Sequence, residues 1–355
     1  MSHLALVYES KYPNARQTVK WRPIPEPESN QIQVKVHATA VNPVDYKEFD
    51  NGWFVTTVPT ILGMDASGEV TKVGSNVTKF SVGDRVLFNG QWNCQGDGSN
   101  GNKATFQQIA LVDADLTAKM PDTLDYDSAA TIPMAMDTAA SALYDLGLSL
   151  TPPWEGGEGK YSGQTFVVLG GSSSVGAYTI QLAVLSGFRV ITTASIVHAD
   201  YLKSIGASTV IDRKSSTVAS DVLAAVGGEP RYVLDAISLA DTQQEAMDIV
   251  APGGTVILVL GVQPRAMGMA LEKNVRLRGC HGAPHRYPEF FRGFWAAVGG
   301  YLERGVIKAN KPRVLPGGLH AWEEAFALHR EGKLSGEKVV MRPWETKEIS
   351  PRDEL

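Results

Sequence analysis

Residues 165–176 read Thr-Phe-Val-Val-Leu-Gly-Gly-Ser-Ser-Ser-Val-Gly, which is a buried-type strand followed by a turn of small residues and a helical pattern over 178–186. Such a turn leaves backbone N–H groups at a helix N-terminus available to a pyrophosphate, so the stretch predicts a dinucleotide site. The spacing departs from the ideal G-x-G-x-x-G. Gly171 and Gly176 match the first and third glycines, whereas Ser173 stands at the second. Taken alone, the motif also fits an ordinary strand-to-helix turn.

The residues beyond this turn alternate between short β-branched strands and helical patterns. We expect strands at 189–193, 209–211, 232–234 and 255–260, and helices at 199–205, 216–226 and 239–250. This alternation is typical of a doubly wound parallel sheet, which binds a dinucleotide at the turn after its first strand. The expected phosphate-binding residues are Gly170, Gly171, Ser172, Ser173, Ser174, Val175 and Gly176.

The end of the second expected strand bears on the choice of cofactor. NAD sites usually place an acid there for the ribose 2′-OH, whereas NADP sites supply donors to the extra phosphate. The chain has Ser195 and no acid at this point, with Lys203 and Arg213 further on. Ser195 and one or both cations could bind a 2′-phosphate by charge-assisted hydrogen bonds, which predicts NADPH. The alternative is that Lys203 and Arg213 are ordinary surface charges.

Composition narrows the class of protein. With 355 residues, 43% of them hydrophobic, the chain is long enough for two domains with sizeable cores. A net charge of −5 without a basic block argues against nucleic acid or a membrane surface as the main partner. The two cysteines, Cys94 and Cys280, suit a reducing cytoplasmic compartment, and the histidines show no ligand spacing, so no metal is expected.

The first 120 residues differ from the middle of the chain, because glycine, proline and asparagine separate short strand patterns. Strands are expected at 32–40, 69–73, 83–88 and 106–112, and the C-terminal end adds a helix at 321–330 and a strand at 338–341. We therefore predict a β-rich domain that is interrupted by a nucleotide-binding unit and then completed.

At this point the chain resembles, over essentially its whole length, the zinc-independent, quinone-reductase-like branch of the medium-chain dehydrogenase/reductases. Residues 40–47 resemble the A-x-N-P-x-D-x-K stretch of that branch, where zinc enzymes carry a cysteine ligand. Residues 62–68 resemble G-H-E-x-x-G, with Met64 replacing the histidine ligand. Together with 170–176, the tail segments 315–319 and 330–340 are most similar to fungal trans-acting enoyl reductases of polyketide pathways. Other fungal quinone-reductase-like enzymes share much of this tail.

The resemblance implies an α/β fold with a GroES-like catalytic domain at 1–135 and 306–355, and a Rossmann NADP-binding domain at 136–305. It also implies metal-free, NADPH-dependent reduction of a conjugated C=C bond. A hydride then adds to the β-carbon, and an enolate forms that needs hydrogen-bond donors. Further cofactor contacts are implied at Leu260, Gly261 and Lys338.

Three residues are expected to be catalytic. The resemblance places Lys47 at the substrate edge, where it can offer charge to the enolate, and Thr138 near the nicotinamide. Their alternatives are a solvated loop cation and a hydroxyl that caps a helix. Tyr46 is a possible proton donor, but it and Lys47 could not both face the ligand if this segment were a strand. Asp65 is expected to be a structural acceptor rather than a base.

The expected substrate is a small molecule or a carrier-bound polyketide, with a polyketide synthase as a possible partner. A soluble quinone or enone reductase and a non-catalytic NADP(H) sensor are the alternatives. Aromatic side chains could supply an apolar wall, although Phe291, Phe294 and Trp295 have helical spacing and fit a core better. The wall candidates are Trp53, Phe54, Met134, Phe290, Phe291, Phe294 and Trp295.

Overall fold

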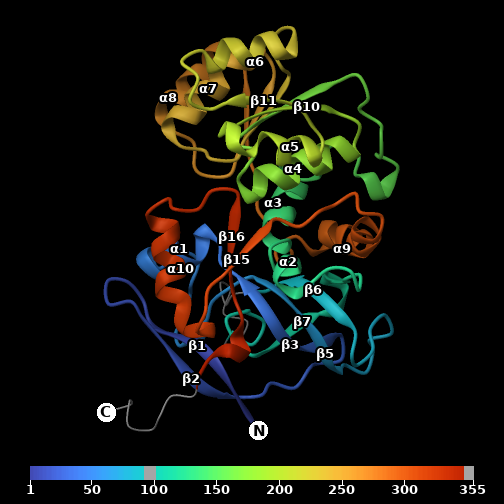
Figure 1. The fold of residues 1–355 in the computed structure, drawn as a ribbon, viewed down its shortest axis with the longest axis vertical. Coiled ribbons are helices and arrows are strands. Elements are labelled where there is room, and N and C mark those ends of the chain that lie inside the picture. Colours follow the sequence, from blue (N-terminus) through green and yellow to red (C-terminus); the bar gives the residue numbers. More distant parts are fainter. Residues whose placement is uncertain (92–100, 348–355) are drawn as a thin grey trace. The chain divides into compact units, whose positions relative to one another are not determined.

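The computed structural model describes residues 1–91 and 101–347, which divide into two compact units (Figure 1). The first unit contains the chain up to Met134, residues Pro284–Glu303, and the chain from Ala309 onward. The second contains Ala135–Ala283 and Arg304–Lys308. Cys94 lies outside the described residues, and Cys280 is buried. No helix in the described ranges is both long and apolar enough to cross a membrane.

The second unit is built on a six-stranded parallel sheet with the order β11-β10-β9-β12-β13-β14. Counted from β9, this is the 3-2-1-4-5-6 order of a dinucleotide-binding Rossmann sheet. Figure 1 shows α4 and α5 on one side of the sheet and α6, α7 and α8 on the other. The strands are β9 (Thr165–Leu169), β10 (Arg189–Ala194), β11 (Ala207–Asp212), β12 (Tyr232–Asp235), β13 (Thr255–Leu258) and β14 (Arg276–Gly279). The helices are α4 (Ser174–Leu185), α5 (Ala199–Ser204), α6 (Val218–Val226), α7 (Ala240–Ile249) and α8 (Pro264–Lys273).

The expected alternation of strands and helices in this unit is confirmed, because helices on both faces of a parallel sheet force its central strands to be apolar throughout. Val167, Val233 and Val256, on three neighbouring strands, are all fully buried in one cluster. Strand β14 was not expected. Its sequence, Arg-Leu-Arg-Gly, has little apolar character because it lies at the edge of the sheet.

Three glycines shape the turn between β9 and α4. Gly170 has φ +79°, which glycine adopts without strain. A Cβ on Gly171 would lie 2.1 Å from Thr192 Oγ1, and a Cβ on Gly176 would lie 2.3 Å from the carbonyl oxygen of Gly170. The side chain of Ser173 caps the helix by accepting the Gly176 N–H at 3.1 Å. Because glycines have no Cβ, α4 can begin in close contact with the end of β9 and with β10.

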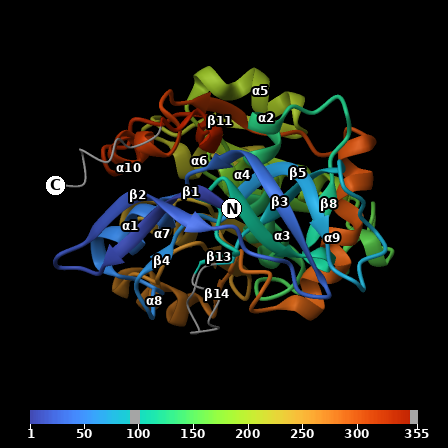
Figure 2. The ribbon, with the colours of Figure 1, turned by 90° about the horizontal axis from the view of Figure 1, so that it is seen from below.

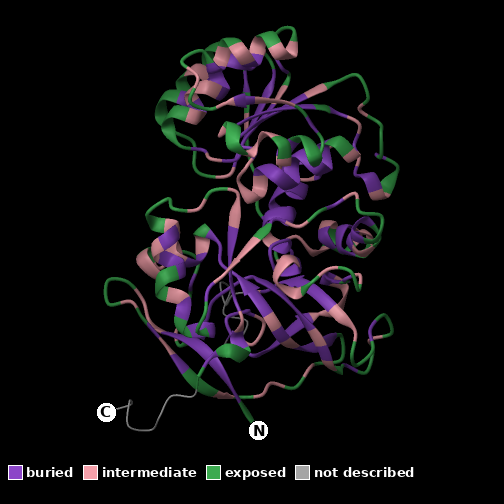
Figure 3. Cartoon of the chain, in the orientation of Figure 1, coloured by how far each residue is buried: buried purple, intermediate pink, exposed green. Residues whose placement is uncertain are grey.

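The first unit contains two sheets. The smaller has the order β2-β1-β4, and the larger has the order β15-β16-β3-β5-β6-β8, with β7 also paired to β3. In Figure 2 β1 and β2 run together, and Figure 3 shows that the central strands of the larger sheet are mostly buried. The strands are β1 (Ser2–Ser10), β2 (Arg16–Pro23), β3 (Gln31–Ala40), β4 (Thr60–Ile61), β5 (Asp65–Val73), β6 (Arg85–Asn89), β7 (Ile109–Asp113), β8 (Thr117–Lys119), β15 (Lys311–Val314) and β16 (Glu337–Met341).

Among the described residues, five α-helices begin in this unit, and the last residues of α3 belong to the second. They are α1 (Pro43–Asn51), α2 (Tyr126–Ala130), α3 (Pro133–Tyr144), α9 (Pro288–Glu303) and α10 (Trp322–Arg330). Strand β16 pairs with β3 in antiparallel fashion, so the C-terminal segment completes the sheet begun near the N-terminus. This return of the chain agrees with the expected interruption of a β-rich domain.

Helix α9 belongs to the first unit, although the sequence analysis assigned residues 284–303 to the second. It packs against β8 and the short 3-10 turn Ala114–Leu116, and Arg292 forms an ion pair with Asp115 at 2.6 Å. Phe291, Phe294 and Trp295 are no more than 1% exposed. The core interpretation of these three aromatic residues is confirmed, and they form no substrate wall.

The close contact at Gly176 gives a stability prediction. We expect Gly176→Ala to lower the free energy of unfolding by roughly 1–3 kcal/mol, because the added methyl group meets backbone that cannot move away cheaply. Gly268 in α8 is the matched control, since a Cβ there has no neighbour within 4 Å. Gly268→Ala should raise stability by about 0.5–1 kcal/mol through helix propensity. Urea denaturation measures both changes, and equal effects would contradict the packing argument.

Candidate functional site

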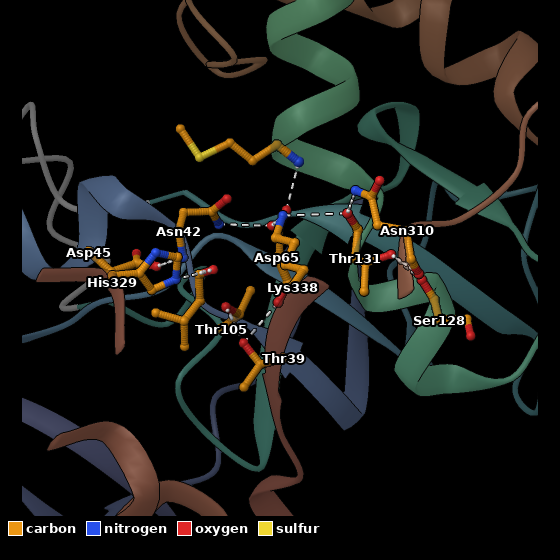
Figure 4. Close-up of polar contacts among 12 residues, drawn as sticks. Thr39, Asn42, Asp45, Asp65, Thr105, Ser128, Thr131, Asn310, His329 and Lys338 are labelled. Atoms are coloured by element: carbon orange, nitrogen blue, oxygen red, sulfur yellow. Dashed lines mark hydrogen bonds and ion pairs between the residues drawn. The ribbon is translucent and has the colours of Figure 1, made fainter. Parts of the chain in front are cut away.

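A buried carboxylate, Asp65, is the centre of the polar network in the first unit (Figure 4). Asp65 begins β5 and is 0% exposed. Its Oδ1 accepts the backbone N–H of Met134 at 2.6 Å, and its Oδ2 accepts the side-chain amide of Asn42 at 2.8 Å. Lys338 forms an ion pair with the same Oδ2. Asp65 is thus a fully engaged acceptor, as the sequence analysis expected.

The partner of Asp65, Lys338 on β16, is also buried, with its side chain only 3% exposed. Its ammonium also donates to the carbonyl oxygen of Thr131 at 3.4 Å. Removing one member of a buried pair leaves an uncompensated charge and costs about 3–5 kcal/mol. The structure therefore gives Lys338 a structural role that the sequence did not reveal. Its contact with the cofactor stays a prediction.

Asn42 links this network to helix α1. It is the N-cap residue, and its backbone N–H donates to the carboxylate of Asp45 at 2.6 Å. Pro43 occupies the first turn, where its missing N–H costs nothing, and Gly52 ends the helix with φ +67°. Because residues 43–51 form a helix, Tyr46 and Lys47 do not point to opposite faces as neighbours on a strand would. The argument that only one of the two residues could face the ligand, which assumed a strand, therefore no longer applies.

Lys47 is half-buried on α1 and is not the solvated loop cation of the alternative interpretation. Burial lowers the pKa of its ammonium below the ordinary lysine value. The Nζ atom lies 5.9 Å from the centroid of the Tyr46 ring and 5.8 Å from that of Trp53. No carboxylate of the described residues forms an ion pair with it. Among the described residues, the Lys47 ammonium therefore has no acidic partner that would neutralise its charge.

Tyr46 lies between Lys47 and two residues of α10. Its ring stacks on His329 at a centroid distance of 6.3 Å, and the Arg330 guanidinium lies 5.8 Å from its ring centroid. Burial, with a smaller contribution from Asp50, raises the pKa of the phenol. Tyr46 therefore keeps its proton at neutral pH, as a proton donor must.

Two further carboxyl groups of α1 are completely buried. Burial raises the pKa of Asp45 to about 8, because the charged form loses its hydration and the neighbouring Asp65 disfavours a second charge. Burial and Asp45 raise the pKa of Glu48 well above its usual range. The hydrogen bond from Asn42 favours the charged form of Asp45 but is outweighed by desolvation. Burial thus disfavours the charged form of both acids in the folded protein.

The residues at the expected zinc-ligand positions do not fit a catalytic zinc ion. Asn42 donates its amide to Asp65, and Met64 is fully buried with a thioether in place of an imidazole. Catalytic zinc sites use three protein ligands drawn from His, Cys, Asp and Glu. Within residues 1–91 and 101–347, no three such side chains are grouped so that they could hold a metal.

The turn that the sequence analysis expects to bind phosphate lies between β9 and α4 of the second unit. Residues 172–175 are partly exposed where α4 begins, and the described residues offer no acceptor to the backbone N–H groups of Ser174 and Val175. Two such N–H groups at the start of a twelve-residue helix suit the pyrophosphate of a dinucleotide.

The expected 2′-phosphate residues lie at the ends of β10 and β11. Ser195 follows β10 directly. The backbone N–H of Arg213 donates to the carbonyl of Ala194 at 2.8 Å, so the backbone of Arg213 lies close to that of Ser195. Both Arg213 and Lys203 are exposed. Lys203 lies in the last turn of α5, and no described contact connects it with Ser195.

Sequence reasoning missed two residues near this corner. Asp212 ends β11 directly opposite Ala194, because the parallel register pairs these two residues. His198 ends the short 3-10 turn that starts after Ser195, and its N–H donates to the Ser195 carbonyl at 3.0 Å. The register of the sheet would have been needed to find Asp212, since no linear spacing identifies it.

The loop after β13 contains Leu260 and Gly261, both exposed. The buried Gln243 of α7 fixes it, because the side-chain amide donates to the carbonyls of Ser238 and Gly261 at 3.0 Å each. A Cβ on Gly261 would meet nothing within 4 Å, so this glycine is not required by packing. Gln243 is a positioning residue that the sequence analysis did not identify.

Thr138 lies in the second turn of α3 and is 9% exposed. The alternative interpretation, a capping hydroxyl at the helix start, does not fit because α3 begins five residues earlier, at Pro133. Thr138 belongs to the second unit, and Lys47 belongs to the first.

Comparisons with known proteins agree with this architecture. Residues 28–122 match the family of alcohol dehydrogenase GroES-like domains, and residues 174–295 match the zinc-binding dehydrogenases. The trans-enoyl reductase himH of Aspergillus japonicus is 36% identical over 88% of this chain and 89% of its own. The lovastatin nonaketide synthase enoyl reductase component lovC of Aspergillus terreus is 31% identical over 90% and 91%. The crystal structure of a putative zinc-dependent alcohol dehydrogenase from Rhizobium etli superposes with a TM-score of 0.80 at 26% identity, over 96% of this chain and 98% of that one.

The buried acid Asp45 predicts how stability depends on pH. Its pKa rises from 3.8 to about 8 on folding, so between these values the folded state holds a proton that the unfolded chain releases. The free energy of unfolding should therefore fall as pH rises, by up to about 1 kcal/mol per unit for this group. Asp45→Asn keeps an acceptor for Asn42 but cannot ionise. Thermal melting from pH 5 to 8 should show a smaller loss in the variant, whereas parallel curves would contradict the assignment.

Proposed function

The chain belongs to the medium-chain dehydrogenase/reductase superfamily, and we propose that it reduces a conjugated C=C bond with NADPH and without a metal. The observation that carries the proposal is the ammonium of Lys47. It is half-buried, no carboxylate of the described residues pairs with it, and it sits on a helix that Asp65 fixes through Asn42. Such a group suits the oxygen of an enolate, where negative charge develops during hydride addition.

A bound nicotinamide cofactor would supply the hydride that adds to the β-carbon of the substrate. Lys47 would donate a hydrogen bond to the carbonyl oxygen and become a stronger partner as that oxygen gains charge. Tyr46 holds its proton at neutral pH and is the candidate donor to the α-carbon. The hydroxyl of Thr138 would orient the carboxamide of the cofactor or the substrate carbonyl. A ketone or alcohol would require a stronger electrophile than these donors.

We infer a preference for NADPH from the end of β10, where Ser195 and Arg213 adjoin. Arg213 is exposed and can form charge-assisted hydrogen bonds to a 2′-phosphate, and Lys203 would add longer-range attraction. Asp212, at the end of β11, opposes this attraction and would favour a ribose hydroxyl. The proposed preference is thus a balance between one close cation and one close anion.

The names of two relatives suggest the source of the substrate. One relative is called a trans-enoyl reductase and another the enoyl reductase component of a nonaketide synthase. We propose by analogy that this chain acts in trans on an α,β-unsaturated polyketide thioester carried by a polyketide synthase. Reduction confined to small quinones or enones would favour the alternative of a free-standing reductase.

Loss of the Lys47 ammonium should slow the chemical step. We expect Lys47→Ala to lower the single-turnover rate of enoyl thioester reduction by about 10- to 1,000-fold, with the chelator EDTA present throughout. The affinity for NADPH should change little. Thr138→Val, which keeps the shape but removes the hydroxyl, should also reduce turnover more than melting temperature.

Lys35→Ala is the matched control for Lys47→Ala. Lys35 is also half-buried in the first unit, and its ammonium lies 5.0 Å from the ring centroid of Trp344. This control should keep normal rates. Full activity and normal melting in Lys47→Ala and Thr138→Val would show that neither residue is catalytic, and Tyr46 would be the next candidate.

The cofactor assignment predicts two opposite mutational effects. NADPH should bind at least about tenfold more tightly than NADH, since one charge-assisted contact can contribute that much. Arg213→Ala should reduce this ratio, and Asp212→Asn should increase it by removing repulsion of the 2′-phosphate. Fluorescence titration of the unmodified protein and the two variants with both cofactors gives the three Kd ratios required. Equal affinities in the unmodified protein would overturn the NADPH proposal.

A further inference from the structure

The guanidinium of Arg330 links the end of α10 to the last turn of α1, and the two helices pack against each other (Figure 1). Its Nε donates to Asp50 Oδ2 and its Nη2 donates to Asp50 Oδ1, both at 2.7 Å. Two parallel hydrogen bonds fix the orientation of the guanidinium as well as its position. The guanidinium also lies 5.8 Å from the ring centroid of Tyr46 and 5.7 Å from that of Phe326. Arg330 is thus held between a carboxylate and two aromatic rings.

The ring of Tyr46 is held by residues of both helices. On α1 it stands one helical turn before Asp50, so the two side chains lie on one face of the helix and a single guanidinium meets both. From α10, the ring of His329 stacks on Tyr46 with an angle of 25° between the ring planes. His329 is itself anchored, since its Nε2 lies 3.2 Å from the carbonyl oxygen of Val41.

The hydroxyl of Tyr46 is not used by its neighbours. The contacts with Lys47, His329 and Arg330 are made by the ring, and no hydrogen bond connects the hydroxyl with any residue in the described ranges. Tyr46 is also only half-buried. A phenol whose ring is fixed while its donor stays unbonded can present that donor to a bound ligand.

The titratable groups around Tyr46 come from both helices: Lys47 and Asp50 on α1, and His329 and Arg330 on α10. Burial and then Asp50 raise the pKa of the phenol, whereas Arg330 lowers it. Burial lowers the pKa of His329 to about 4, which favours its uncharged ring at neutral pH. Arg330 is therefore the group on α10 whose charge favours a phenolate at this position.

We propose that Arg330 positions Tyr46 for proton transfer to the substrate and stabilises the phenolate that this transfer leaves. The O–H bond of the phenol breaks, the proton forms a new C–H bond at the α-carbon of the enolate, and the negative charge passes from the enolate to the Tyr46 oxygen. Solvent then returns a proton to the phenolate. This inference rests on the proposed function, and it makes Arg330 a positioning residue that acts through Tyr46.

A titration of Tyr46 tests the effect of the charges without turnover. The chain would be labelled with fluorotyrosine, whose phenol titrates at lower pH than that of tyrosine, and followed by fluorine NMR, with Tyr46→Phe to assign the signal. Arg330→Met should raise the pKa of residue 46 by about 0.5–1 unit, and Asp50→Asn should lower it by a similar amount, because the two changes remove charges of opposite sign. Arg330→Lys keeps the charge and should shift the pKa less.

The configuration of the product tests the proton transfer itself. Reduction of a 2-enoyl N-acetylcysteamine thioester with NADPH in deuterium oxide places deuterium on the α-carbon, and a fixed phenol delivers it to one face. The unmodified protein should therefore give one configuration at this carbon. Arg330→Met and Tyr46→Phe should give mixtures, because solvent then reaches the enolate directly. Turnover should also fall, by about 100-fold in Tyr46→Phe and by less in Arg330→Met.

Arg342→Met is the matched control. Arg342 also forms a bidentate ion pair in the first unit, with Asp127 at 3.0 and 2.6 Å, and its side chain is 43% exposed compared with 35% for Arg330. It has no contact with Tyr46. The pKa of residue 46 and the product configuration should therefore equal those of the unmodified protein. Thermal melting verifies that each variant is folded.

The two measurements separate failure of the inference from failure of the proposed function. An unchanged pKa of residue 46 in the folded Arg330→Met and Asp50→Asn variants would overturn the inference, whether or not thioesters are reduced. A single product configuration in Tyr46→Phe would also overturn it, because the proton would then come from another donor, and enoyl reduction would stand. Opposite pKa shifts without reduction of any enoyl thioester would refute the enoyl reductase proposal and leave the control of Tyr46 by Arg330 supported.

Discussion

The carboxylate of Asp65 is the constraint on which the first unit depends. A fully buried charge is tolerated only when it is neutralised and hydrogen-bonded, and Asp65 receives an ammonium, a side-chain amide and a backbone N–H. These donors come from β16, from the cap of α1 and from the start of α3. One acid therefore fixes where α1 and α3 begin, and so helps to determine where Lys47 is held and how the helix that carries Thr138 starts.

Charge is distributed unevenly around this acid. Lys338 is neutralised by Asp65, and burial raises the pKa of both Asp45 and Glu48, which disfavours their charged forms. Lys47 lies on the same helix as these two acids, and its ammonium lies near the rings of Tyr46 and Trp53, with no ion pair to a carboxylate of the described residues. In the proposed function, the Lys47 ammonium takes the electrophilic role that a metal ion has in zinc enzymes.

The sequence predicted the parallel sheet and the phosphate turn because both depend on local features: β-branched runs, small residues and helical spacing. It did not predict α1, since this short segment packs only Tyr46 and Phe49 against the core and is stabilised by its cap and by tertiary packing. The Asp65–Lys338 pair joins residues 273 positions apart, and Asp212 becomes relevant only through strand register. The unit to which α9 belongs depends on which surface its aromatic residues cover, and helical spacing alone does not specify that surface.

The long separation between Asp65 and Lys338 has a consequence for biosynthesis. All six sheet strands of the second unit lie within one continuous stretch, Ala135–Ala283, so this part can assemble as soon as that stretch has left the ribosome. The first unit must wait, because β16 and its lysine are made only after every strand of the second unit. Until then Asp65 lacks its counter-ion and β3 lacks its partner at Ala40, so the nascent chain carries a finished nucleotide-binding half beside an open, aggregation-prone β half.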